Sequence, residues 1–410
     1  MHILFISEYF PPLIRGGGEI NLNLLTQALS KKINVSVLTS HQKGLKRFEE
    51  KNKVKIYRAL DSGENPDGLI DNFKRSFIFP NSVIKQVKKI VKKQKIDAIH
   101  FIGTSVMAAT QISKLNIPLF ATIESYPALC PKGDRIYWGR EECKIKCSRS
   151  NFFLCQYNSK EIGKMKNRFW LKYNLPLLEY IFQHYKKIQE GLKHCQLIAI
   201  SEYIQKVLLQ HGLKSKVIPN AINLKDFNGN KIKDKNEKKT KKEKLNILYL
   251  GSLIKSKGPH ILLEAIDGLN VHCDLYGEGN MKEELQKTII KKGLDSKIHS
   301  PVSYKRVPSL YQNTDIVVFP SLWPEPFGRI SIEAMATGKP IIGSKIGGIK
   351  ETIKNGFLVQ PGNIPEMRKA LQKLINSPHL RRSLALKGKK QVKEYQEEKV
   401  IKEMVDYYGI

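Results

Sequence analysis

Long hydrophobic runs are missing from this 410-residue sequence. No stretch approaches the roughly 18 uninterrupted apolar residues that predict a membrane-spanning helix. The first residues are apolar only over residues 3–6, and they lack the basic start, the longer apolar run and the small-residue cleavage site of a signal peptide. These residues predict a first strand instead. Because neither a membrane-spanning helix nor a signal peptide is predicted, we expect a cytoplasmic protein.

Acidic residues are scarce. The chain has 38 Asp and Glu against 70 Lys and Arg, which gives a formal net charge of +32. Such a field attracts phosphates, nucleic acid or anionic lipid, although an excess of lysine is also compatible with a generally basic surface. A nucleic-acid-binding protein is therefore one alternative hypothesis. Because no RNA- or DNA-binding motif is present, we expect no specific nucleic-acid partner.

Cysteine is also infrequent, and six residues in a cytoplasmic chain argue against a disulfide framework. Four of them fall in a loop-rich stretch: Cys130, Cys143, Cys147 and Cys155. Four thiolates can hold zinc tetrahedrally, but this spacing lacks paired CxxC motifs. A structural zinc site and free or redox-paired thiols both stay open. The other two cysteines, Cys195 and Cys273, are expected in the core.

Short apolar runs alternate with helical patterns along the whole chain. In the first part the strand-like runs are residues 3–7, 35–39, 96–102, 119–123 and 197–200. In the second part they are residues 247–250, 271–276, 316–319 and 340–342. This order predicts an α/β fold with two Rossmann-like, doubly wound parallel-sheet domains facing a cleft.

Composition places the domain boundaries. Residues 228–244 are rich in lysine and almost free of apolar side chains, which is typical of a solvated linker. We therefore predict an N-terminal domain over residues 1–222 with the cysteine-containing insertion, a linker over 223–244 and a C-terminal domain over 245–390. Residues 391–410 are helical in period with no strand after them, so this helix is expected to cross back to the N-terminal domain.

Two segments are both basic and amphipathic. Residues 83–91 place valine and isoleucine on one stripe with lysines around it, and residues 169–187 combine aromatic and basic side chains. Such helices either pack their apolar face on a sheet or lie on an anionic membrane surface. A peripheral location on the inner face of the membrane therefore remains open.

A glycine-rich loop joins the first strand to the first helix. It contains Gly16, Gly17 and Gly18, followed by Glu19. Loops at the carboxyl edge of a parallel sheet bind ligands, and glycines let backbone N–H groups at a helix start approach phosphate. The pattern is not GxGxxG, so a dinucleotide site is not indicated. A tight turn and a phosphate loop are both compatible with it.

The second domain begins with the same order of strand, loop and helix. Residues 249–258 read YLGSLIKSKG. Lys257 is placed to reach a pyrophosphate, and Ser252 can donate one hydrogen bond. A solvated loop lysine is the alternative interpretation of Lys257 alone.

The most informative stretch is FPSLWPEPFGRISIE at residues 319–333. Glu325 lies in a proline-rich loop, where we expect it to face a sugar. Glu333 lies in the first turns of the next helix, where it can bond ribose hydroxyls. N–H donors and the dipole at that helix start favour a phosphate leaving group. These donors belong to Phe327, Gly328 and Arg329. In isolation, either glutamate is compatible with an ordinary surface or helix-terminal charge.

Taken together, these motifs resemble the retaining glycosyltransferases of group 1, glycosyltransferase family 4, which have the GT-B fold. The matching pieces follow the family's order along nearly the whole chain. They are GGGE at 16–19, VIPNAINL at 217–224, GSLIKSKG at 251–258, YGEG at 276–279, EPFGRISIEAMATGKPII at 325–342 and GGIKE at 347–351. The two glutamates followed by EAMATGKP form the most specific piece.

The resemblance implies a hexosyltransferase that moves a sugar from a UDP-, GDP- or ADP-linked donor to a glycan or lipid-linked acceptor, in cell-envelope polysaccharide or glycolipid synthesis. It makes the N-terminal domain the acceptor domain and the C-terminal domain the donor domain, and it requires no cofactor or metal for catalysis. Glu325 would contact the sugar, Lys257 the departing diphosphate and Glu333 the ribose. Donor binding would also involve Gly17, Gly18, Ser252, Phe327, Gly328 and Arg329.

Two departures from the family concern phosphate and base recognition. Arginine is usual where Ser252 stands, so phosphate neutralisation would rest on Lys257 and a basic neighbour such as Lys255. The loop at residues 299–303 is shorter than in the family, which puts recognition of the nucleobase in question.

A third departure concerns catalysis. Many relatives carry His followed by Asp where Glu124 and Ser125 stand, and that His lies beside the anomeric centre. Glu124 is therefore a candidate catalytic residue that acts as a polar contact, serves a different acceptor or marks lost activity. A GT-B-like protein without transferase activity is the alternative that Glu124 keeps open. A structural glutamate at the strand end is a further alternative.

Overall fold

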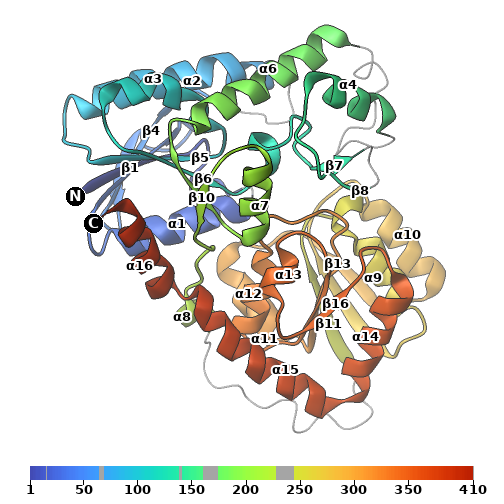
Figure 1. Cartoon of the computed structure of the whole chain (residues 1–410). Coiled ribbons are helices and arrows are strands. Elements are labelled where there is room, and N and C mark those ends of the chain that lie inside the picture. Colours follow the sequence, from blue (N-terminus) through green and yellow to red (C-terminus); the bar gives the residue numbers. More distant parts are fainter. Residues whose placement is uncertain (15, 64–68, 138–140, 160–173, 228–243, 410) are drawn as a thin grey trace. The chain divides into compact units, whose positions relative to one another are not determined.

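The computed structural model describes residues 1–14, 16–63, 69–137, 141–159, 174–227 and 244–409 (Figure 1). They form two compact units. Unit 1 contains the described residues of Met1–Ile162, Asn167–Ala221 and Glu397–Ile410, and unit 2 contains those of Ile222–Gln396. Within the predicted linker, Leu224–Phe227 form the short helix α8, and residues 228–243 lie outside the described part.

Unit 1 is built on a sheet with the strand order β10-β9-β6-β5-β1-β2-β4-β3, in which only the β3–β4 pair is antiparallel. The strands are β1 His2–Ile6, β2 Asn34–Ser40, β3 Phe48–Lys51, β4 Val54–Leu60, β5 Ala98–Ile102, β6 Leu119–Ile123, β9 Gln196–Ala199 and β10 Ser215–Val217. A separate hairpin pairs β7 Ile136–Tyr137 with β8 Glu141–Glu142.

Helices cover both faces of this sheet (Figure 1). They are α1 Gly17–Leu29, α2 Leu69–Val91, α3 Ala109–Ile112, α4 Arg149–Asn158, α6 Leu175–Leu192, α7 Glu202–Gln210 and α16 Glu397–Tyr408. The central strands β1, β5 and β6 are buried along their whole length, which explains their near-continuous apolar sequence. The C-terminal helix α16 packs beside α1, and its Met404 and Tyr408 join the core of unit 1.

The two amphipathic segments bury their apolar side chains inside unit 1. In α2, Val83 and Val87 are fully buried, and in α6, Leu178 and Ile188 are almost fully buried. Packing on the interior therefore accounts for the helical period that the sequence shows. Residues 169–173 of the second segment lie outside the described part. None of the described helices is long and apolar enough to cross a membrane.

Unit 2 contains a fully parallel sheet with the order β13-β12-β11-β14-β15-β16. Its strands are β11 Leu245–Leu250, β12 Val271–Tyr276, β13 Ser296–His299, β14 Ile316–Phe319, β15 Ile341–Ser344 and β16 Phe357–Val359. After α8, its described α-helices are α9 Pro259–Ile266, α10 Lys282–Lys292, α11 Val307–Gln312, α12 Arg329–Ala336, α13 Ile349–Thr352, α14 Ile364–Asn376 and α15 Pro378–Gln391. The core lies between the sheet and α9, α10 and α14.

The predicted α/β fold with two Rossmann-like parallel sheets is confirmed by these two units. Residues 119–123 and 271–276 form strands with the predicted bounds, whereas the strand predicted at residues 340–342 runs over Ile341–Ser344. Five strands of the two sheets were not predicted: β3, β4, β10, β13 and β16. Most of these are short and partly exposed, so they carry little of the apolar signal that marks a buried strand.

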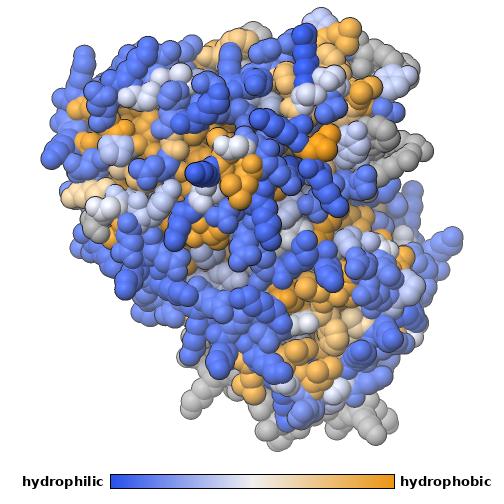
Figure 2. Space-filling model, in the orientation of Figure 1, coloured by the Kyte–Doolittle hydropathy of each residue, from blue (hydrophilic) through white to orange (hydrophobic). Residues whose placement is uncertain are grey.

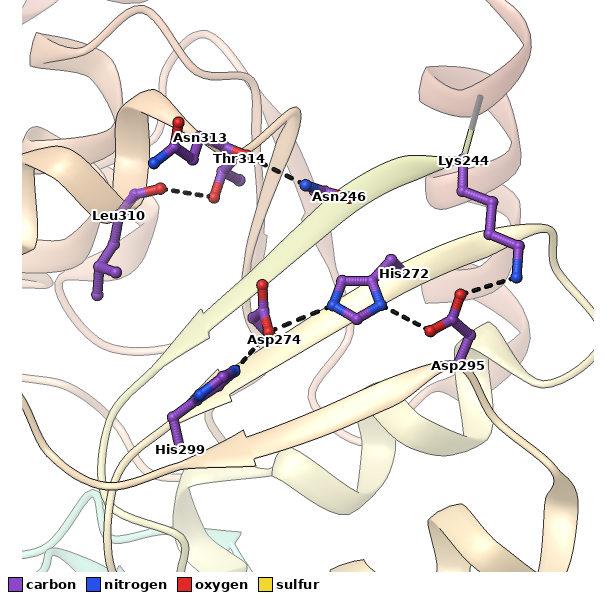
Figure 3. Close-up of polar contacts among 9 residues, drawn as sticks. All are labelled: Lys244, Asn246, His272, Asp274, Asp295, His299, Leu310, Asn313 and Thr314. Atoms are coloured by element: carbon purple, nitrogen blue, oxygen red, sulfur yellow. Dashed lines mark hydrogen bonds and ion pairs between the residues drawn. The ribbon is translucent and has the colours of Figure 1, made fainter. Parts of the chain in front are cut away.

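Polar side chains form a chain across β12 and β13 in unit 2 (Figure 3). His272 Nδ1 lies 2.7 Å from Asp295 Oδ1, and Asp295 also accepts from Lys244 Nζ at 2.7 Å. On the other side, Asp274 Oδ1 lies 3.3 Å from His272 Nε2 and 2.6 Å from His299 Nε2. Burial lowers the pKa of His272, but the two aspartates outweigh it, so this pKa is raised above its ordinary value.

We predict that Asp295→Asn lowers the pKa of His272, measured by NMR titration of the imidazole protons. A histidine whose pKa is raised in the folded state contributes stability below its unfolded pKa of about 6.5, and this contribution is lost as pH rises through the folded pKa. The variant should therefore lose more stability in mild acid than in mild alkali. Asp267→Asn, whose carboxylate binds Lys292 at 2.7 Å, is the control that leaves His272 unchanged. An unaltered His272 titration in Asp295→Asn would contradict the assignment.

Candidate functional site

The strand order of unit 2 reverses between β11 and β14, because β12 and β13 lie on one side of β11 while β14, β15 and β16 lie on the other. In open parallel sheets, ligands bind at such a reversal, just beyond the carboxyl ends of the strands. Two loops leave the sheet at this point. One follows β11 and includes the short turn of helix Lys255–Lys257, and the other follows β14 and carries Glu325.

Lys257 and Glu325 meet between these two loops. Lys257 Nζ lies 2.6 Å from Glu325 Oε1, and Ser321 donates to the same oxygen at 3.0 Å. The ammonium group also lies over the ring of Trp323, 4.2 Å from its centroid. Glu325 is buried and the Lys257 side chain is about three-quarters buried, so the pair is only partly accessible to water. A cation held in this way is oriented before any ligand arrives.

Backbone contacts lock the two loops together. The carbonyl oxygen of Ser256 accepts hydrogen bonds from the N–H groups of Leu322 and Trp323. Gly258 has φ +69°, and a Cβ there would lie 2.0 Å from the carbonyl oxygen of Pro320. Only glycine satisfies both the left-handed backbone and this close approach. The position of Lys257 therefore depends on the glycine that follows it.

A second glycine turn supports Glu325 from the other side. The N–H of Gly348 donates to the Glu325 carbonyl oxygen at 2.7 Å, and a Cβ on Gly347 would lie 2.4 Å from that oxygen. The GG pair therefore lets the turn before α13 pack directly on the Glu325 backbone. The sequence placed both glycines near the site, but the contact that explains them is visible only in the structure.

Glu333 lies on α12 in a closed polar network. It is only 4% exposed, and it accepts from Tyr304 at 2.9 Å and from Tyr311 at 3.0 Å. Arg329 Nε lies 2.9 Å from Glu333 Oε1. Burial raises the pKa of Glu333, and the Arg329 charge counteracts this only in part. Both carboxylate oxygens thus already have protein partners, which the sequence did not indicate.

The start of α12 has the geometry that the sequence predicted. Gly328 is the residue before the first turn and has φ +106°, and the helix begins at Arg329. The Arg329 side chain turns toward Glu333 and Tyr304, with its Nη2 donating to the Tyr304 hydroxyl at 2.8 Å. The Arg329 side chain is thus bound to other residues of unit 2. The groups of this segment that would donate to a bound anion are the backbone N–H groups at the start of α12.

Ser252 lies on the exposed surface of the loop that follows β11. Its carbonyl oxygen accepts from the buried Tyr249 hydroxyl at 2.8 Å. A Cβ on Gly277 would lie 1.9 Å from the carbonyl oxygen of Gly251. The YGEG segment and the loop that carries Ser252 therefore pack backbone against backbone, and the structure brings two of the recognised motifs together.

The remaining predicted residues lie in unit 1. Its strand order reverses between β1 and β5, and the glycine loop that opens α1 at Gly17 follows β1. A Cβ on Gly18 would lie 2.6 Å from Glu124 Oε2, and Glu124 Oε1 accepts from Asn21 Nδ2 at 3.0 Å. Asn21 in turn accepts from the N–H of Ala221 at 3.1 Å. Glu124 therefore lies beside the glycine loop, held by a residue that the sequence did not single out.

Cys130, Cys143, Cys147 and Cys155 all line one small cavity in unit 1. Burial raises the pKa of Cys147 to about 12, and the other three thiols add to this effect. No disulfide joins them in the structure. Across the described residues, no three histidine, cysteine, aspartate or glutamate side chains stand in positions ready to hold a metal ion. As expected, Cys273 is fully buried, whereas Cys195 is half-buried.

Several residues of these networks were not predicted from the sequence. Ser321 and Trp323 lie within the FPSLWPEPFG stretch, so their closeness to Glu325 was open to prediction. Tyr304 and Tyr311 precede Glu333 by 29 and 22 positions, and no local pattern connects them to it. Asn21 lies 103 positions from Glu124 and likewise carries no sequence signal.

Two family models match the chain. The model described as Glycosyltransferase Family 4 covers residues 15–226, and the one described as Glycosyl transferases group 1 covers residues 230–391. An uncharacterized glycosyltransferase of Methanocaldococcus jannaschii is 24% identical over 98% of this chain and 96% of its own length. The capsular polysaccharide biosynthesis glycosyltransferase CapM of Staphylococcus aureus is 28% identical over 48% of this chain and 56% of its own length.

Solved structures share the fold. Sucrose-phosphate synthase from Thermosynechococcus elongatus superposes with a TM-score of 0.76 at 20% identity and covers 100% of this chain and 98% of its own. Anabaena HepE, solved in complex with UDP and glucose, gives a TM-score of 0.68 at 19% identity and covers 99% of each chain. At these identities the likeness establishes a common fold.

We predict that Gly258→Ala destabilises the protein by more than about 3 kcal/mol, beyond the usual range for single substitutions. The added methyl group would meet the Pro320 carbonyl and force the two loops apart. Gly268→Ala is the matched control, because Gly268 has φ +71° but its Cβ would have Arg368 Nη2 as nearest atom at an ordinary 3.5 Å. That variant should lose only the left-handed backbone cost of roughly 1–2 kcal/mol. Equal losses in urea unfolding would show that the Pro320 contact does not matter.

Proposed function

Because the chain belongs to the group 1 glycosyltransferases of Glycosyltransferase Family 4, we propose that it transfers a sugar from a nucleotide diphosphate donor to a glycan or lipid-linked acceptor with retention of anomeric configuration. The donor is a UDP-, GDP- or ADP-linked hexose, and the pathway is cell-envelope polysaccharide or glycolipid synthesis. CapM, named for capsular polysaccharide biosynthesis, and HepE, solved with UDP and glucose, support this choice by similarity.

The contact between Lys257 and Glu325 carries the proposal. It lies at the strand reversal of unit 2, where a parallel sheet binds its ligand, and it joins a cation and a carboxylate that suit a sugar diphosphate. The ammonium group would move from Glu325 toward the diphosphate as the donor binds. Glu325 would then accept hydrogen bonds from the sugar hydroxyls. One ion pair thus keeps both groups oriented until the donor replaces it.

The reaction breaks the bond between the anomeric carbon and the diphosphate oxygen and forms a bond from that carbon to the acceptor oxygen. The acceptor proton passes to an oxygen of the leaving diphosphate on the same face of the sugar, which gives retention. Lys257 and the N–H groups at the start of α12 would stabilise the charge that develops on the diphosphate. These protein groups perform the neutralisation for which other enzymes use a metal ion, so we propose that catalysis requires none.

The rest of the donor would contact unit 2 beside this centre. The phosphate would meet the N–H groups of Phe327, Gly328 and Arg329 and the hydroxyl of Ser252. We assign the ribose to Glu333, whose carboxylate would exchange a tyrosine partner for a ribose hydroxyl. Tyr304 and Arg329 would then remain as the groups that hold Glu333 in place. Gly17 and Gly18 would bring the N–H groups of α1 to the donor.

The acceptor is assigned to unit 1. Glu124 lies beside Gly18 and is oriented by Asn21, which makes it a fixed hydrogen-bond acceptor at the carboxyl end of β6. A carboxylate in this position would accept a hydrogen bond from an acceptor hydroxyl. We propose this role for Glu124 in place of the histidine that relatives carry.

An anionic membrane surface would suit a lipid-linked acceptor. Phe77 on α2 and Leu175 on α6 are exposed by 41% and 59%, and Lys187 Nζ lies 5.0 Å from the centroid of the Phe77 ring. Apolar and basic side chains side by side favour peripheral binding to anionic lipid. On the face shown in Figure 2, hydrophobic residues form separate areas within a mostly hydrophilic surface. We therefore propose local and reversible contact.

The donor assignment predicts thermal stabilisation by one class of sugar nucleotide. A ligand that binds only the folded state stabilises it by RT ln(1 + [L]/Kd), about 2.7 kcal/mol at one hundred times Kd. We expect one UDP-, GDP- or ADP-sugar to raise Tm in the wild type and to lose most of this effect in Lys257→Ala and Glu325→Gln. Lys291→Ala, an exposed lysine on α10, is the charge-matched control and should keep the full shift.

If the sugar nucleotide raises the Tm of Lys257→Ala as much as that of the wild type, the donor binds elsewhere. If no sugar nucleotide stabilises the wild type, the transferase proposal fails. Once an acceptor is found, the anomeric proton coupling of the product reports retention directly, and inversion would refute the proposed mechanism. Activity in excess chelator tests metal independence in the same assay.

Glu124→Gln separates the two half-sites. The amide keeps the size of the side chain but loses the carboxylate charge, so the donor-induced Tm shift should stay at its wild-type size. Turnover with the acceptor should fall by roughly a hundred- to a thousandfold, the range in which one positioned polar group acts. Asn21→Ala should lower turnover in the same direction by releasing Glu124. Unchanged turnover in Glu124→Gln would mean that Glu124 has only a structural role.

A further inference from the structure

The four clustered thiols line one small cavity. The cavity has a volume of about 20 Å³, comparable to the minimum space of one water molecule. Cys130, Cys143, Cys147 and Cys155 all line it, although they come from different turns and from α4. Sulfur ligands from one loop-rich segment around so small a space are typical of thiolate metal centres.

Cys130 begins a tight turn that lines the cavity. Burial and the nearby Asp134 charge raise the pKa of the Cys130 thiol, and the backbone N–H groups of Lys132, Gly133 and Arg135 offset this only in part. The turn is closed by a hydrogen bond of 2.9 Å from the Gly133 N–H to the Cys130 carbonyl, and Gly133 has φ +82°. N–H donors directed at a sulfur stabilise its charged form. A metal ion that displaced the thiol proton would leave the Cys130 sulfur beside these N–H groups.

Two buried cations also line the cavity. Arg135 is only 2% exposed, and its Nε has no hydrogen-bond partner within the described part of the chain. The Lys132 side chain is likewise 2% exposed, and it bonds the Ile136 carbonyl and pairs with Asp134 at 3.3 Å. Asp134 offsets one of these charges, so one buried cation remains without an anion beside it. Four thiolates on a divalent ion carry an excess of negative charge that would meet this need.

The local fold explains why an ion would be useful here. Among the described residues between β6 and α4, the secondary structure is limited to a short turn of helix and the β7–β8 hairpin, whose strands have two residues each. A segment with so little secondary structure and so small a core gains fixed geometry from metal ligation. The same segment starts directly after Glu124, at the carboxyl end of β6.

We propose that Cys130, Cys143, Cys147 and Cys155 bind one Zn²⁺ ion that fixes the segment between β6 and α4. In the structure the sulfurs line the cavity without surrounding a common point, so binding requires cysteine side chains to turn inward. Cys130, Cys143 and Cys147 are half-buried and lie on turns, where rotation about one bond needs no movement of the core. The ion takes a structural role, and the step releases the thiol protons to solvent.

Metal analysis of the purified full-length protein tests the site. After exhaustive dialysis, we expect inductively coupled plasma mass spectrometry to find one zinc ion per chain. A mercurial thiol reagent should release this zinc. Replacement by Co²⁺ should give the intense visible bands and the sulfur-to-metal charge-transfer absorption of a tetrahedral thiolate centre. These readouts do not depend on any transferase activity, so their failure is distinct from failure of the proposed function.

Matched serine variants locate the ligands. Cys147→Ser and Cys143→Ser change half-buried turn residues, so they should fold and lose most of the bound zinc and the Co²⁺ charge-transfer band. Cys195→Ser, a half-buried cysteine outside the cavity, should keep one zinc per chain. Zinc-free wild-type protein that takes up no Co²⁺ would overturn the proposal. So would iron in place of zinc, a disulfide among these cysteines, or full zinc content in both turn variants.

Discussion

The parallel pairing of β11 with β14 is the constraint on which the candidate donor site depends. These strands are distant in sequence, and their pairing brings the loops that follow them to one edge of the sheet. Lys257 and Glu325 lie 68 positions apart and meet at 2.6 Å because of this pairing. An ion pair placed there is partly shielded from water, so its charges would act strongly on the diphosphate that we propose binds there. The strand order of unit 2 therefore determines where the candidate donor site lies, and the side chains at that point determine its charge.

Glycine makes the close contacts around that edge. Gly258 lets one loop approach Pro320, Gly347 lets another approach Glu325, and Gly277 does the same at Gly251. In each case a methyl group would lie less than 2.5 Å from a carbonyl oxygen. The short glycine motifs along the sequence are thus the points where backbones touch. They position charged groups without contributing a functional side chain of their own.

Much of this arrangement was open to prediction from the sequence. Buried parallel strands such as β6 and β12 are apolar over their whole length or in alternation, and the helix that begins at Arg329 follows directly from its glycine start. Strand β4 was missed although VKIYRAL alternates between buried and half-buried residues, because its buried set includes Arg58. The partners of Glu333 could not be predicted, since Tyr304 and Tyr311 lie 29 and 22 positions before it and reach it only through tertiary packing.

The sequence by itself determined the fold class, the family and the order of the site motifs, because strand periodicity, glycine turns and short charged motifs are local properties of the chain. Only the tertiary structure decided which of those residues touch. It placed Lys257 against Glu325, surrounded Glu333 with phenols, seated Glu124 beside Gly18 and gathered four cysteines with Arg135 around one cavity. Contacts between distant residues depend on loop paths and on the burial of charge, and no local pattern encodes either.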